Sequence, residues 1–359
     1  MSIKLAINGF GRIGRLAFRR AYDEKDFEVV AINDLSSAAN LAYLLKYDSA
    51  QGPWRVNDIS AEEDPTGETK GFIVLRTKNG DQRIPVIGQK DPALLEWSKY
   101  GVDIVLECTG RFKGQADALV HVEKGGAKGV VISAPADKET RTFVYGVNHT
   151  ELTADLKVIS GASCTTNCLA PVLKVLEEKW GIRGGYMTTV HAYTNDQTSL
   201  DLVKEKDFRR GRACAQNIVP SSTGAAKAIN LVLPTLKGRL QGGAIRVPVL
   251  DGSLVDLSLI LTRKVKDDDV NRINEAMLRA SRGSLRGVLG YTDEPIVSRD
   301  IIGRTEGSIF DATQTRIFTT PEGEQLVKVV SWYDNEYSYT CQFVRLARHF
   351  AHVLGCDAE

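Results

Sequence analysis

The sequence predicts an α/β protein that combines a doubly wound parallel sheet with a second, α+β domain built on a mixed, mainly antiparallel sheet. Up to about residue 160, short apolar runs such as 102–110 alternate with helix-compatible stretches, a pattern typical of parallel sheets. Farther along, longer runs of alternating polarity such as 253–265 favour antiparallel pairing. The length of 359 residues also favours two domains.

Composition and charge indicate an ordinary globular chain. Hydrophobic residues make up 43% and charged residues 25%, and 46 basic residues against 45 acidic ones leave a net charge of +1. This balance provides no electrostatic field for nucleic acid or an anionic membrane, so we expect neither as a partner. No apolar run reaches the roughly 20 residues of a membrane span. Glycine and arginine interrupt the N-terminal apolar segment at once, which argues against a signal peptide.

The cysteines indicate a reducing environment. Six of them are too few for a disulfide scaffold in a chain of this length, and they form no C-x-x-C pair. Cys164 and Cys168 are close in sequence, but the chain has no second pair of closely spaced cysteines and no histidine cluster near them. We therefore expect no metal site. The predicted location is the cytoplasm.

The elements of the first domain follow one another along the chain. Residues 4–8 and 27–34 are short apolar runs that predict buried strands, and a helix-compatible stretch at 15–26 separates them. The charged segment 58–71, interrupted by Pro65 and Gly67, predicts a surface excursion before the next strand.

A glycine turn joins the first strand to the first helix. Gly9, Gly11 and Gly14 match G-x-G-x-x-G, and Asp34 stands twenty residues after Gly14 at the end of the second strand. In this context backbone N–H groups and the helix N-terminus hold the pyrophosphate of a dinucleotide. The Asp34 carboxylate would accept hydrogen bonds from ribose hydroxyls and repel a 2′-phosphate. A Rossmann-type domain with NAD rather than NADP is therefore predicted, and a turn needed only for packing remains the alternative.

The second domain has longer strands. Residues 156–160 predict a strand that leads into a helix at 169–181, and residues 185–194 and 242–250 predict further strands. Aspartates precede a one-sided apolar pattern at 267–281, which predicts a capped amphipathic helix. The chain ends in another helical stretch.

Cys164 falls between a predicted strand and a predicted helix, near the positive end of the helix dipole. We expect a thiol there to have a lowered pKa and a larger thiolate fraction, as a nucleophile needs. Cys168 lies one turn inside the helix beside Leu169 and is expected to be structural. The residues alone leave a structural role for Cys164 equally open.

A nucleophilic thiol needs a base, and the five histidines are the usual candidates. His191 lies near the end of the predicted strand 185–194, in the domain that Cys164 opens, so we expect it to be the base. The other four lie in the periphery of the first domain or in the terminal helix: His121, His149, His349 and His352.

Six motifs together resemble the phosphorylating, NAD-dependent glyceraldehyde-3-phosphate dehydrogenases. They are INGFGRIGR, SCTTNCLAP, HAYTNDQ, SSTGAAKA, RVPV and SWYDNEYSY. Their order and spacing agree with that family over essentially the whole chain. The resemblance implies that the NAD-binding domain spans residues 1–163 and is completed by a C-terminal helix at 336–359, around a catalytic domain at 164–335. It also implies a homotetramer.

The resemblance further implies a glycolytic reaction. Cys164 would attack the aldehyde of glyceraldehyde 3-phosphate to form a thiohemiacetal, and His191 would assist proton removal while hydride leaves for NAD. Inorganic phosphate would then attack the resulting thioester and release 1,3-bisphosphoglycerate. Two anion pockets are needed for this chemistry, one for the phosphate of the substrate and one for the attacking phosphate.

Residue by residue, the resemblance implies the following ligands. The first anion pocket would be formed by Thr194, Arg210 and Arg246, and the second by Ser163, Thr165, Thr223 and Gly224. Besides the glycines, NAD would be contacted by Arg12, Ile13, Asp34, Lys90, Thr109, Ser133 and Asn335. Pattern alone would equally allow Lys90 to be an ordinary surface lysine and would favour a solvated Arg246 on the outer face of its strand.

The sequence departs from the family pattern at two positions, the first of which is expected near the adenosine end of the cofactor. Val203 stands where proline is common, which loosens the preference for NAD over NADP, and Ser338 stands where glycine is usual. The alternatives are an erythrose-4-phosphate, NADP-linked or non-phosphorylating dehydrogenase of the same fold, or a non-catalytic binding paralogue. The presence of Cys164, His191 and Arg246 together argues against the last of these.

Overall fold

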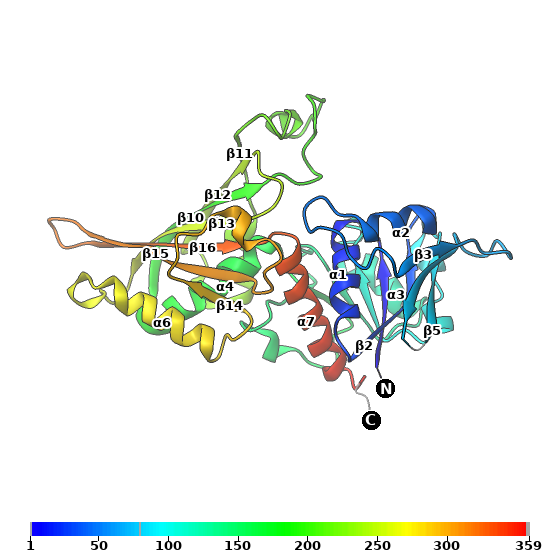
Figure 1. Ribbon diagram of the computed structural model, residues 1–359. Coiled ribbons are helices and arrows are strands. Elements are labelled where there is room, and N and C mark those ends of the chain that lie inside the picture. The colour runs from blue at the N-terminus through cyan, green and yellow to red at the C-terminus, as the bar shows by residue number, and fades with distance from the viewer. Residues whose placement is uncertain (1, 79, 357–359) are drawn as a thin grey trace. The chain divides into compact units, whose positions relative to one another are not determined.

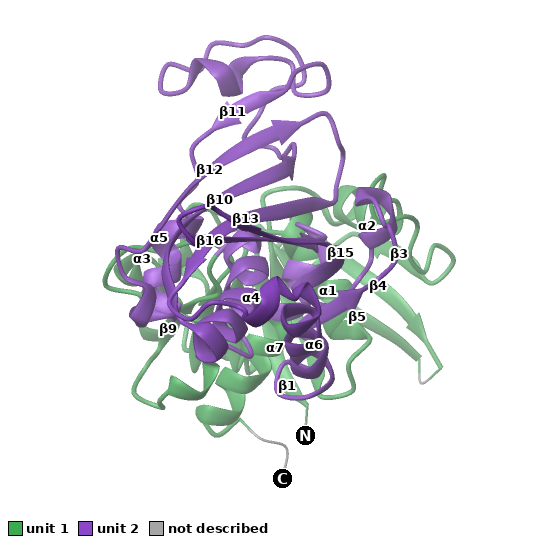
Figure 2. Ribbon diagram, turned by 90° about the vertical axis from the view of Figure 1, so that its left-hand side faces the viewer, with its two compact units in different colours: residues 1–143, 149–162, 343–359 green, residues 144–148, 163–342 purple. Residues whose placement is uncertain are grey.

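The computed structural model describes residues 2–78 and 80–356, which fold into two compact units. Unit 1 comprises residues 1–143, 149–162 and 343–359, and unit 2 comprises residues 144–148 and 163–342 (Figure 2). Each unit is built on a sheet of its own, as the sequence predicts. The last three residues of the predicted terminal helix, 357–359, lie outside the described residues.

Unit 1 contains a nine-stranded sheet with the order β3-β4-β5-β2-β1-β6-β7-β9-β8. From β5 to β8 neighbouring strands run parallel, which confirms the predicted doubly wound sheet, whereas β3, β4 and β5 pair antiparallel at one edge. The strands are β1 (Ile3–Asn8), β2 (Phe27–Asn33), β3 (Ile59–Glu62), β4 (Phe72–Thr77), β5 (Gly80–Ile87), β6 (Ile104–Glu107), β7 (Gly129–Ile132), β8 (Arg141–Thr142) and β9 (Val158–Ser160).

Part of the charged segment 58–71 is strand rather than the predicted excursion. Its first residues form β3, which pairs with β4 in the register Ile59↔Leu75. The physical reason is local, since Ile59 is buried and ties this polar stretch to the edge of the sheet.

Helices pack against the nine-stranded sheet of unit 1 (Figure 1). They are α1 (Arg12–Tyr22), α2 (Ala38–Lys46), α3 (Gln115–Glu123) and the second half of α7 (Tyr337–Val353). α1 contacts β1 and β2, and α3 contacts β7 and β9. Phe350 of α7 packs over Gly129 of β7, where a side chain on the glycine would collide with the ring.

The parallel strands of unit 1 end at a common edge. Asn8, Asn33, Ile87 and Glu107 are the last residues of β1, β2, β5 and β6, which are neighbours in the sheet. In open α/β sheets ligands bind beyond the carboxyl ends of the strands, so this edge is where a ligand site is expected.

Unit 2 contains a seven-stranded sheet with the order β11-β12-β10-β13-β16-β15-β14. The β10–β12 and β14–β15 pairs are parallel and the other pairs antiparallel, which confirms the predicted mixed, mainly antiparallel sheet. The strands are β10 (Ile182–Ala192), β11 (Val219–Ser221), β12 (Leu240–Val247), β13 (Ser253–Leu261), β14 (Leu289–Thr292), β15 (Ser308–Thr319) and β16 (Gln325–Tyr333).

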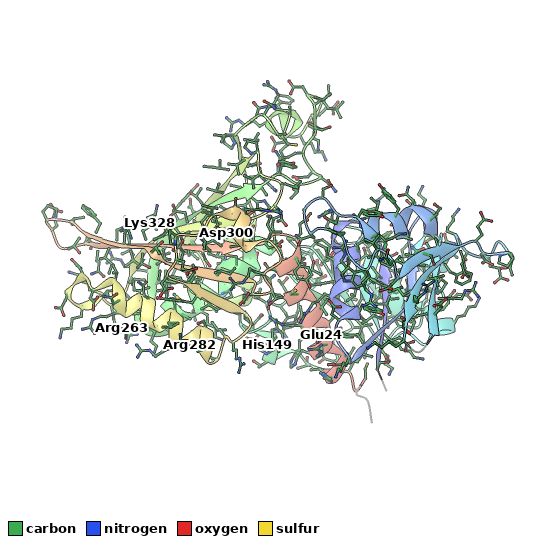
Figure 3. The ribbon with its side chains drawn as sticks, in the orientation of Figure 1. Glu24, His149, Arg263, Arg282, Asp300 and Lys328 are labelled. Atoms are coloured by element: carbon green, nitrogen blue, oxygen red, sulfur yellow. The ribbon has the colours of Figure 1, made fainter. Side chains whose placement is uncertain are left out.

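The helices of unit 2 are α4 (Cys164–Trp180), α5 (Ala225–Val232) and α6 (Val270–Arg282). All three contact strands of the sheet, and burial along β13 alternates residue by residue, as expected for a sheet with one covered face. Lys328 of β16, labelled in Figure 3, is half-buried. It forms a 2.7 Å ion pair with Asp256, a half-buried residue of the neighbouring strand β13.

Short 3₁₀ turns complete the two units. They are η1 (Pro92–Leu94), η2 (Trp97–Tyr100), η3 (His149–Glu151), η4 (Phe208–Gly211), η5 (Pro234–Leu236), η6 (Lys266–Asp268) and η7 (Ser298–Ile301). Within residues 2–78 and 80–356, no helix has both the length and the apolar character that crossing a membrane requires.

Candidate functional site

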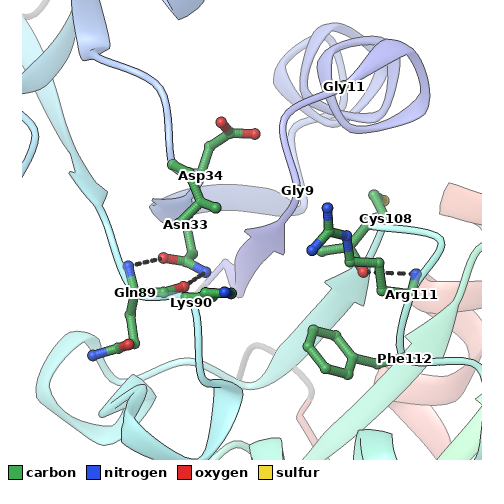
Figure 4. A pocket seen from close by; sticks show the side chains of 11 residues that line it. Gly9, Gly11, Asn33, Asp34, Gln89, Lys90, Cys108, Arg111 and Phe112 are labelled. Atoms are coloured by element: carbon green, nitrogen blue, oxygen red, sulfur yellow. Dashed lines mark hydrogen bonds between the residues drawn. The ribbon is translucent and has the colours of Figure 1, made fainter.

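A pocket of about 280 Å³ lies at the carboxyl-end edge of the unit 1 sheet (Figure 4). Five residues that the sequence singled out line it: Gly9, Gly11, Asp34, Lys90 and Thr109. Sequence reasoning missed six further lining residues, which are Asn33, Leu35, Gln89, Cys108, Arg111 and Phe112. Each of them stands within three positions of a predicted residue, so the signal available was its place at the end of a buried strand or shortly after it.

The glycine turn makes the pocket possible because it allows close backbone approaches. Gly9 has a φ of +89°, and a Cβ there would lie 2.7 Å from the backbone nitrogen of Thr109. A Cβ on Gly14 would lie 2.1 Å from the carbonyl oxygen of Gly9. Gly11 is the N-cap of α1 and has no side chain to cap it, so the helix N-terminus opens beside the pocket. This arrangement suits a pyrophosphate.

The Asp34 carboxylate is held rigidly at the pocket. Its Oδ2 accepts the Phe10 N–H at 2.9 Å, and its Oδ1 accepts the Ser36 N–H at 2.9 Å. Each oxygen keeps a second lone pair, which suits a pair of hydroxyl donors such as those of a ribose.

Five predicted cofactor residues are not among those that line this pocket, and one of them, Asn335, belongs to unit 2. Arg12 forms a 2.5 Å ion pair with Asp48, and Ile13 is half-buried in α1. Gly14 acts through its close contact with Gly9. Ser133 follows β7 and donates its backbone N–H to the Glu107 carbonyl at 3.0 Å.

The catalytic candidates lie in unit 2, where Cys164 is the first residue of α4. The helix begins earlier than the predicted 169–181 because the Ser163 side chain caps it, accepting the Thr166 N–H at 3.1 Å. Ala162, two residues before Cys164, has a φ of +59°, a left-handed conformation that is costly for alanine. Backbone strain of this kind collects at functional sites.

His191 approaches the cysteine from β10. Its Nε2 lies 3.5 Å from the Cys164 Sγ, within reach of a proton transfer. The structure thus brings together the two residues that the sequence named as nucleophile and base. Cys168 is fully buried and contacts the Ser308 hydroxyl at 3.7 Å, as a structural residue would.

Burial disfavours a Cys164 thiolate beside a neutral His191, and it also disfavours a His191 imidazolium beside a neutral thiol. Although Cys164 as a residue is only partly buried, burial of its thiol raises its pKa to about 11, against an opposing effect of the Arg246 charge. This is contrary to the lowered pKa expected from the helix dipole, because desolvation outweighs it. Burial, followed by the Arg246 charge, lowers the pKa of His191 to about 3. A proton that moves from Sγ to Nε2 would charge both partners together.

The Nδ1 atom of His191 lies between a donor and an acceptor. The Arg246 Nη1 is 2.8 Å away and can only donate, whereas the Ala192 carbonyl oxygen is 2.6 Å away and can only accept. The first contact fits a neutral ring with its proton on Nε2, and the second fits a proton on Nδ1. Arg246 also donates to Ala192 O at 2.9 Å and to Thr194 Oγ1 at 3.1 Å.

Asp196 gathers the predicted ligands of the first anion pocket, although the sequence did not single it out. Arg210 and Thr194 donate hydrogen bonds to its carboxylate, and the Arg246 Nη2 lies 3.9 Å away. Burial opposes ionisation of Asp196, but the Thr194 hydroxyl and the two arginines lower its pKa overall. Thr194, Arg210 and Arg246 are therefore brought together around one carboxylate.

The ligands predicted for the second anion pocket are distributed differently. The Thr165 hydroxyl is buried and bonds the Tyr333 OH at 2.9 Å, which in turn bonds Thr189 at 2.8 Å. Thr223 and Gly224 precede α5, and the Thr223 hydroxyl accepts the Ala225 N–H at 3.2 Å. No hydrogen bond between these last two and Thr165 is present among the described residues.

Asn335 is buried with its amide oriented by two donors. Its Oδ1 accepts the Ser253 hydroxyl at 2.7 Å and the Gly252 N–H at 3.2 Å. The Ser253 hydroxyl also accepts the Ala192 N–H at 3.0 Å, which links Asn335 to the residue after His191. Because Oδ1 takes both donors, the Nδ2 of Asn335 remains the group with which it could bond a ligand carbonyl.

Across residues 2–78 and 80–356, no three His, Cys, Asp or Glu side chains gather in a way that could hold a metal ion. The polar groups found in the two units suit organic and phosphate ligands. They are donors, namely backbone N–H groups, hydroxyls and guanidinium groups, and one acceptor, the Asp34 carboxylate.

Comparison with known proteins finds one family for both halves of the chain. The profile described as "Glyceraldehyde 3-phosphate dehydrogenase, NAD binding domain" matches residues 3–115, and the one described as "Glyceraldehyde 3-phosphate dehydrogenase, C-terminal domain" matches residues 163–335. The glyceraldehyde-3-phosphate dehydrogenase of Clostridium pasteurianum is 52% identical over 351 residues, covering 98% of this chain and 99% of the relative. Glyceraldehyde-3-phosphate dehydrogenase 1 of Bacillus subtilis is 51% identical over 352 residues, with the same coverage of each.

The Cys164–His191 contact leads to a testable prediction about thiol reactivity. In His191→Asn the thiol loses the group that could take its proton, and burial still holds the pKa of the thiol above its usual range. We expect alkylation of Cys164 by iodoacetamide at neutral pH to slow about 10²-fold, with the lost rate returning only at high pH. The rate is followed from about pH 6 to pH 10 by mass spectrometry of the Cys164 peptide.

His352→Asn provides the control, because His352 is exposed on α7. Its alkylation profile should match that of the wild type. A profile of His191→Asn that is superimposable on the wild type would show that the thiol does not use this imidazole.

Proposed function

We propose, from the premise that the chain belongs to the glyceraldehyde-3-phosphate dehydrogenase family, that it oxidises glyceraldehyde 3-phosphate with NAD and inorganic phosphate to 1,3-bisphosphoglycerate and NADH. This is a step of glycolysis and gluconeogenesis. The observation that carries the proposal is the 3.5 Å contact between Cys164 Sγ and His191 Nε2 at the start of a capped helix.

The first step forms a covalent bond to the substrate. Cys164 Sγ attacks the aldehyde carbon while its proton passes to His191 Nε2. His191 then passes this proton to the carbonyl oxygen of the substrate, which becomes the hydroxyl of a thiohemiacetal, and the imidazole is neutral again. Since burial disfavours a lone thiolate and a lone imidazolium, the proton transfer accompanies the attack instead of preceding it.

The second step oxidises the thiohemiacetal to a thioester. When bound, NAD supplies the acceptor for the hydride that leaves the substrate carbon. The pocket of unit 1 fits this cofactor, since Gly9 and Gly11 leave room at the N-terminus of α1 for a pyrophosphate and Asp34 offers lone pairs to ribose hydroxyls. His191 takes the proton of the thiohemiacetal hydroxyl as the hydride leaves. A phosphate oxygen then attacks the thioester carbon, and Cys164 departs as a thiol by taking the proton back from His191.

Arg246 connects substrate binding to the protonation of His191 in this proposal. Guanidinium groups favour phosphate oxygens as partners, so a bound phosphate competes with His191 Nδ1 for Arg246. Once Nδ1 loses this donor, its remaining partner is the Ala192 carbonyl, which favours the proton on Nδ1. The lone pair then lies on Nε2 and faces Cys164, as a base requires.

The other predicted residues complete the proposal. Thr194 and Arg210 join Arg246 in the pocket for the substrate phosphate, and the second pocket uses a further group of residues. That group is Ser163, Thr165, Thr223 and Gly224. Asn335 uses its Nδ2 to hold the carboxamide of NAD, and the cofactor site also includes Arg12, Ile13, Lys90, Thr109 and Ser133.

The proposal also assigns a role to each domain and an oligomeric state to the protein. Residues 1–163 with 336–359 bind the cofactor, and residues 164–335 carry the chemistry. The protein works in the cytoplasm, as its sparse cysteines indicate, and forms a homotetramer, as the family resemblance implies. Sedimentation equilibrium of the purified protein measures the assembly, and a monomer mass would contradict it.

The reaction is tested by NADH formation from glyceraldehyde 3-phosphate and NAD, with and without inorganic phosphate, in the wild type and in Cys164→Ser. We expect sustained turnover that requires phosphate and is lost in the variant, because an alcohol is a far weaker nucleophile than a thiol in this site. Turnover without phosphate would mean that water resolves the thioester and would remove the second anion pocket. Faster turnover of erythrose 4-phosphate would reassign the substrate.

Cofactor choice is tested at Asp34. In Asp34→Asn we expect the KM for NAD to rise about tenfold, since a charged hydrogen-bond acceptor is lost, and the preference for NAD over NADP to fall because the repulsion of a 2′-phosphate is removed. Asp81→Asn, at an exposed position of β5 in the same unit, is the control. An unchanged ratio of kcat/KM for the two cofactors would contradict this role of Asp34.

A further inference from the structure

We propose that Glu107, a buried carboxylate beneath the pocket of unit 1, orients both walls of that pocket and so acts as a positioning residue for NAD. The proposal rests on the proposed function of this pocket. Glu107 is the last residue of β6 and is 1% exposed. It does not line the pocket itself, and the chemistry described above makes no use of it.

The carboxylate of Glu107 is surrounded by hydrogen-bond donors. Its Oε1 accepts the backbone N–H of Thr109 at 2.8 Å and the Thr109 hydroxyl. Its Oε2 accepts the side-chain amide of Asn8 at 2.5 Å and lies 3.3 Å from His121 Nε2. A buried acceptor with four such neighbours is satisfied without a cationic partner.

The fourth neighbour is a donor because of Trp97. The indole N–H of Trp97 lies 2.9 Å from His121 Nδ1 and can only donate, so Nδ1 is the acceptor. A neutral His121 then carries its proton on Nε2, the atom that faces Glu107. Trp97 and His121 are fully buried, so this arrangement cannot be exchanged for contacts with water.

A relay of two asparagines continues from Glu107 across the sheet. Asn8 donates to Glu107 and accepts the Asn33 Nδ2 at 2.8 Å on its Oδ1. Asn33 accepts the Gln89 N–H at 2.9 Å on its Oδ1 and also donates to the Gln89 carbonyl at 2.9 Å (Figure 4). The relay crosses the ends of β6, β1 and β2 and reaches the residues after β5.

Each amide in the relay has one permitted orientation. The Gln89 N–H is a backbone donor that cannot turn, so the oxygen of Asn33 must face it. This leaves the Asn33 amide to donate to Asn8, whose own amide must then donate to Glu107. The last donor of this series, the Asn8 amide, needs a hydrogen-bond acceptor, and the Glu107 carboxylate is that acceptor.

Both walls of the pocket therefore depend on Glu107. Asn33 and Gln89 line one wall, and Thr109 and Arg111 line another. The Thr109 hydroxyl, besides its bond to Glu107, accepts the Arg111 N–H at 3.1 Å. Displacing the carboxylate would shift the residues that contact a bound ligand from both directions, although Glu107 would not touch that ligand.

The test is a double-mutant cycle in which the carboxylate is moved from Glu107 to position 8. Glu107→Gln places an NH₂ group against the Asn8 amide or against the Thr109 donors, and Asn8→Asp places two carboxylates side by side. In the combined variant an Asp at position 8 accepts from Asn33, His121 and the new glutamine, whose oxygen accepts from Thr109. All hydrogen bonds are then made again.

We expect the dissociation constant of NAD, measured by isothermal titration calorimetry, to rise about tenfold in each single variant and to return to within about threefold of the wild type in the combined variant. The KM for NAD should follow it, whereas the KM for glyceraldehyde 3-phosphate should stay unchanged. Glu123→Gln, exposed at the end of α3 in the same unit, should bind NAD like the wild type.

The possible results separate this inference from the proposed function. A wild type that binds no NAD in the calorimeter would refute the proposed function. A wild type that binds NAD while Glu107→Gln binds it equally well would refute only the positioning role. A combined variant no better than the weaker single variant would also overturn it, since loss of packing alone gives no recovery.

A second pair of variants serves if Glu107→Gln does not fold. His121→Gln can accept from Trp97 and donate to Glu107, so it should keep NAD affinity within about threefold, whereas His121→Leu removes the donor and should weaken binding about tenfold. Equal affinities of these two variants would contradict the proposal, because His121 does not line the pocket.

Discussion

The buried contact between Cys164 and His191 is the constraint on which the proposed chemistry depends. α4 begins at Cys164 and packs against the sheet that contains β10, so side chains 27 positions apart come within 3.5 Å. The same packing removes water, raises the pKa of the thiol and lowers that of the imidazole. Because neither charge is favourable alone, the two residues act as a pair, and Arg246 influences both through its charge.

In unit 1, polar groups are held in fixed positions at the edge of the sheet where several parallel strands end together. The backbone of the glycine turn comes so close to Thr109 and to itself that only glycine fits at positions 9 and 14. Beneath this turn the side chains of Asn8, Asn33 and Glu107 are buried and hydrogen-bond one another in a row. Exposed backbone N–H groups and a rigid carboxylate remain above it, which are the groups that a dinucleotide requires.

Much of this arrangement could be predicted from the sequence, because it follows from local pattern. Hydrophobic periodicity distinguishes the parallel sheet from the mixed one, and the spacing of Gly9, Gly14 and Asp34 identifies the turn. Contacts between residues that are far apart in the sequence leave no local pattern from which they could be predicted. The position of Asp196 between two arginines was therefore not predicted. The lowered thiol pKa was predicted wrongly, since the helix N-terminus is visible in the sequence and the desolvation around Cys164 is not.

Asp196 has a consequence for how the adjacent guanidinium groups would receive an anion. Its carboxylate already balances the charge of Arg210 and lies 3.9 Å from Arg246, so these arginines carry their own counter-ion. An incoming phosphate would have to displace this carboxylate from the guanidinium groups. Because Asp196 remains attached to the chain beside them, the phosphate would also meet a charge of its own sign, so this region would bind phosphate less tightly than the same arginines without Asp196.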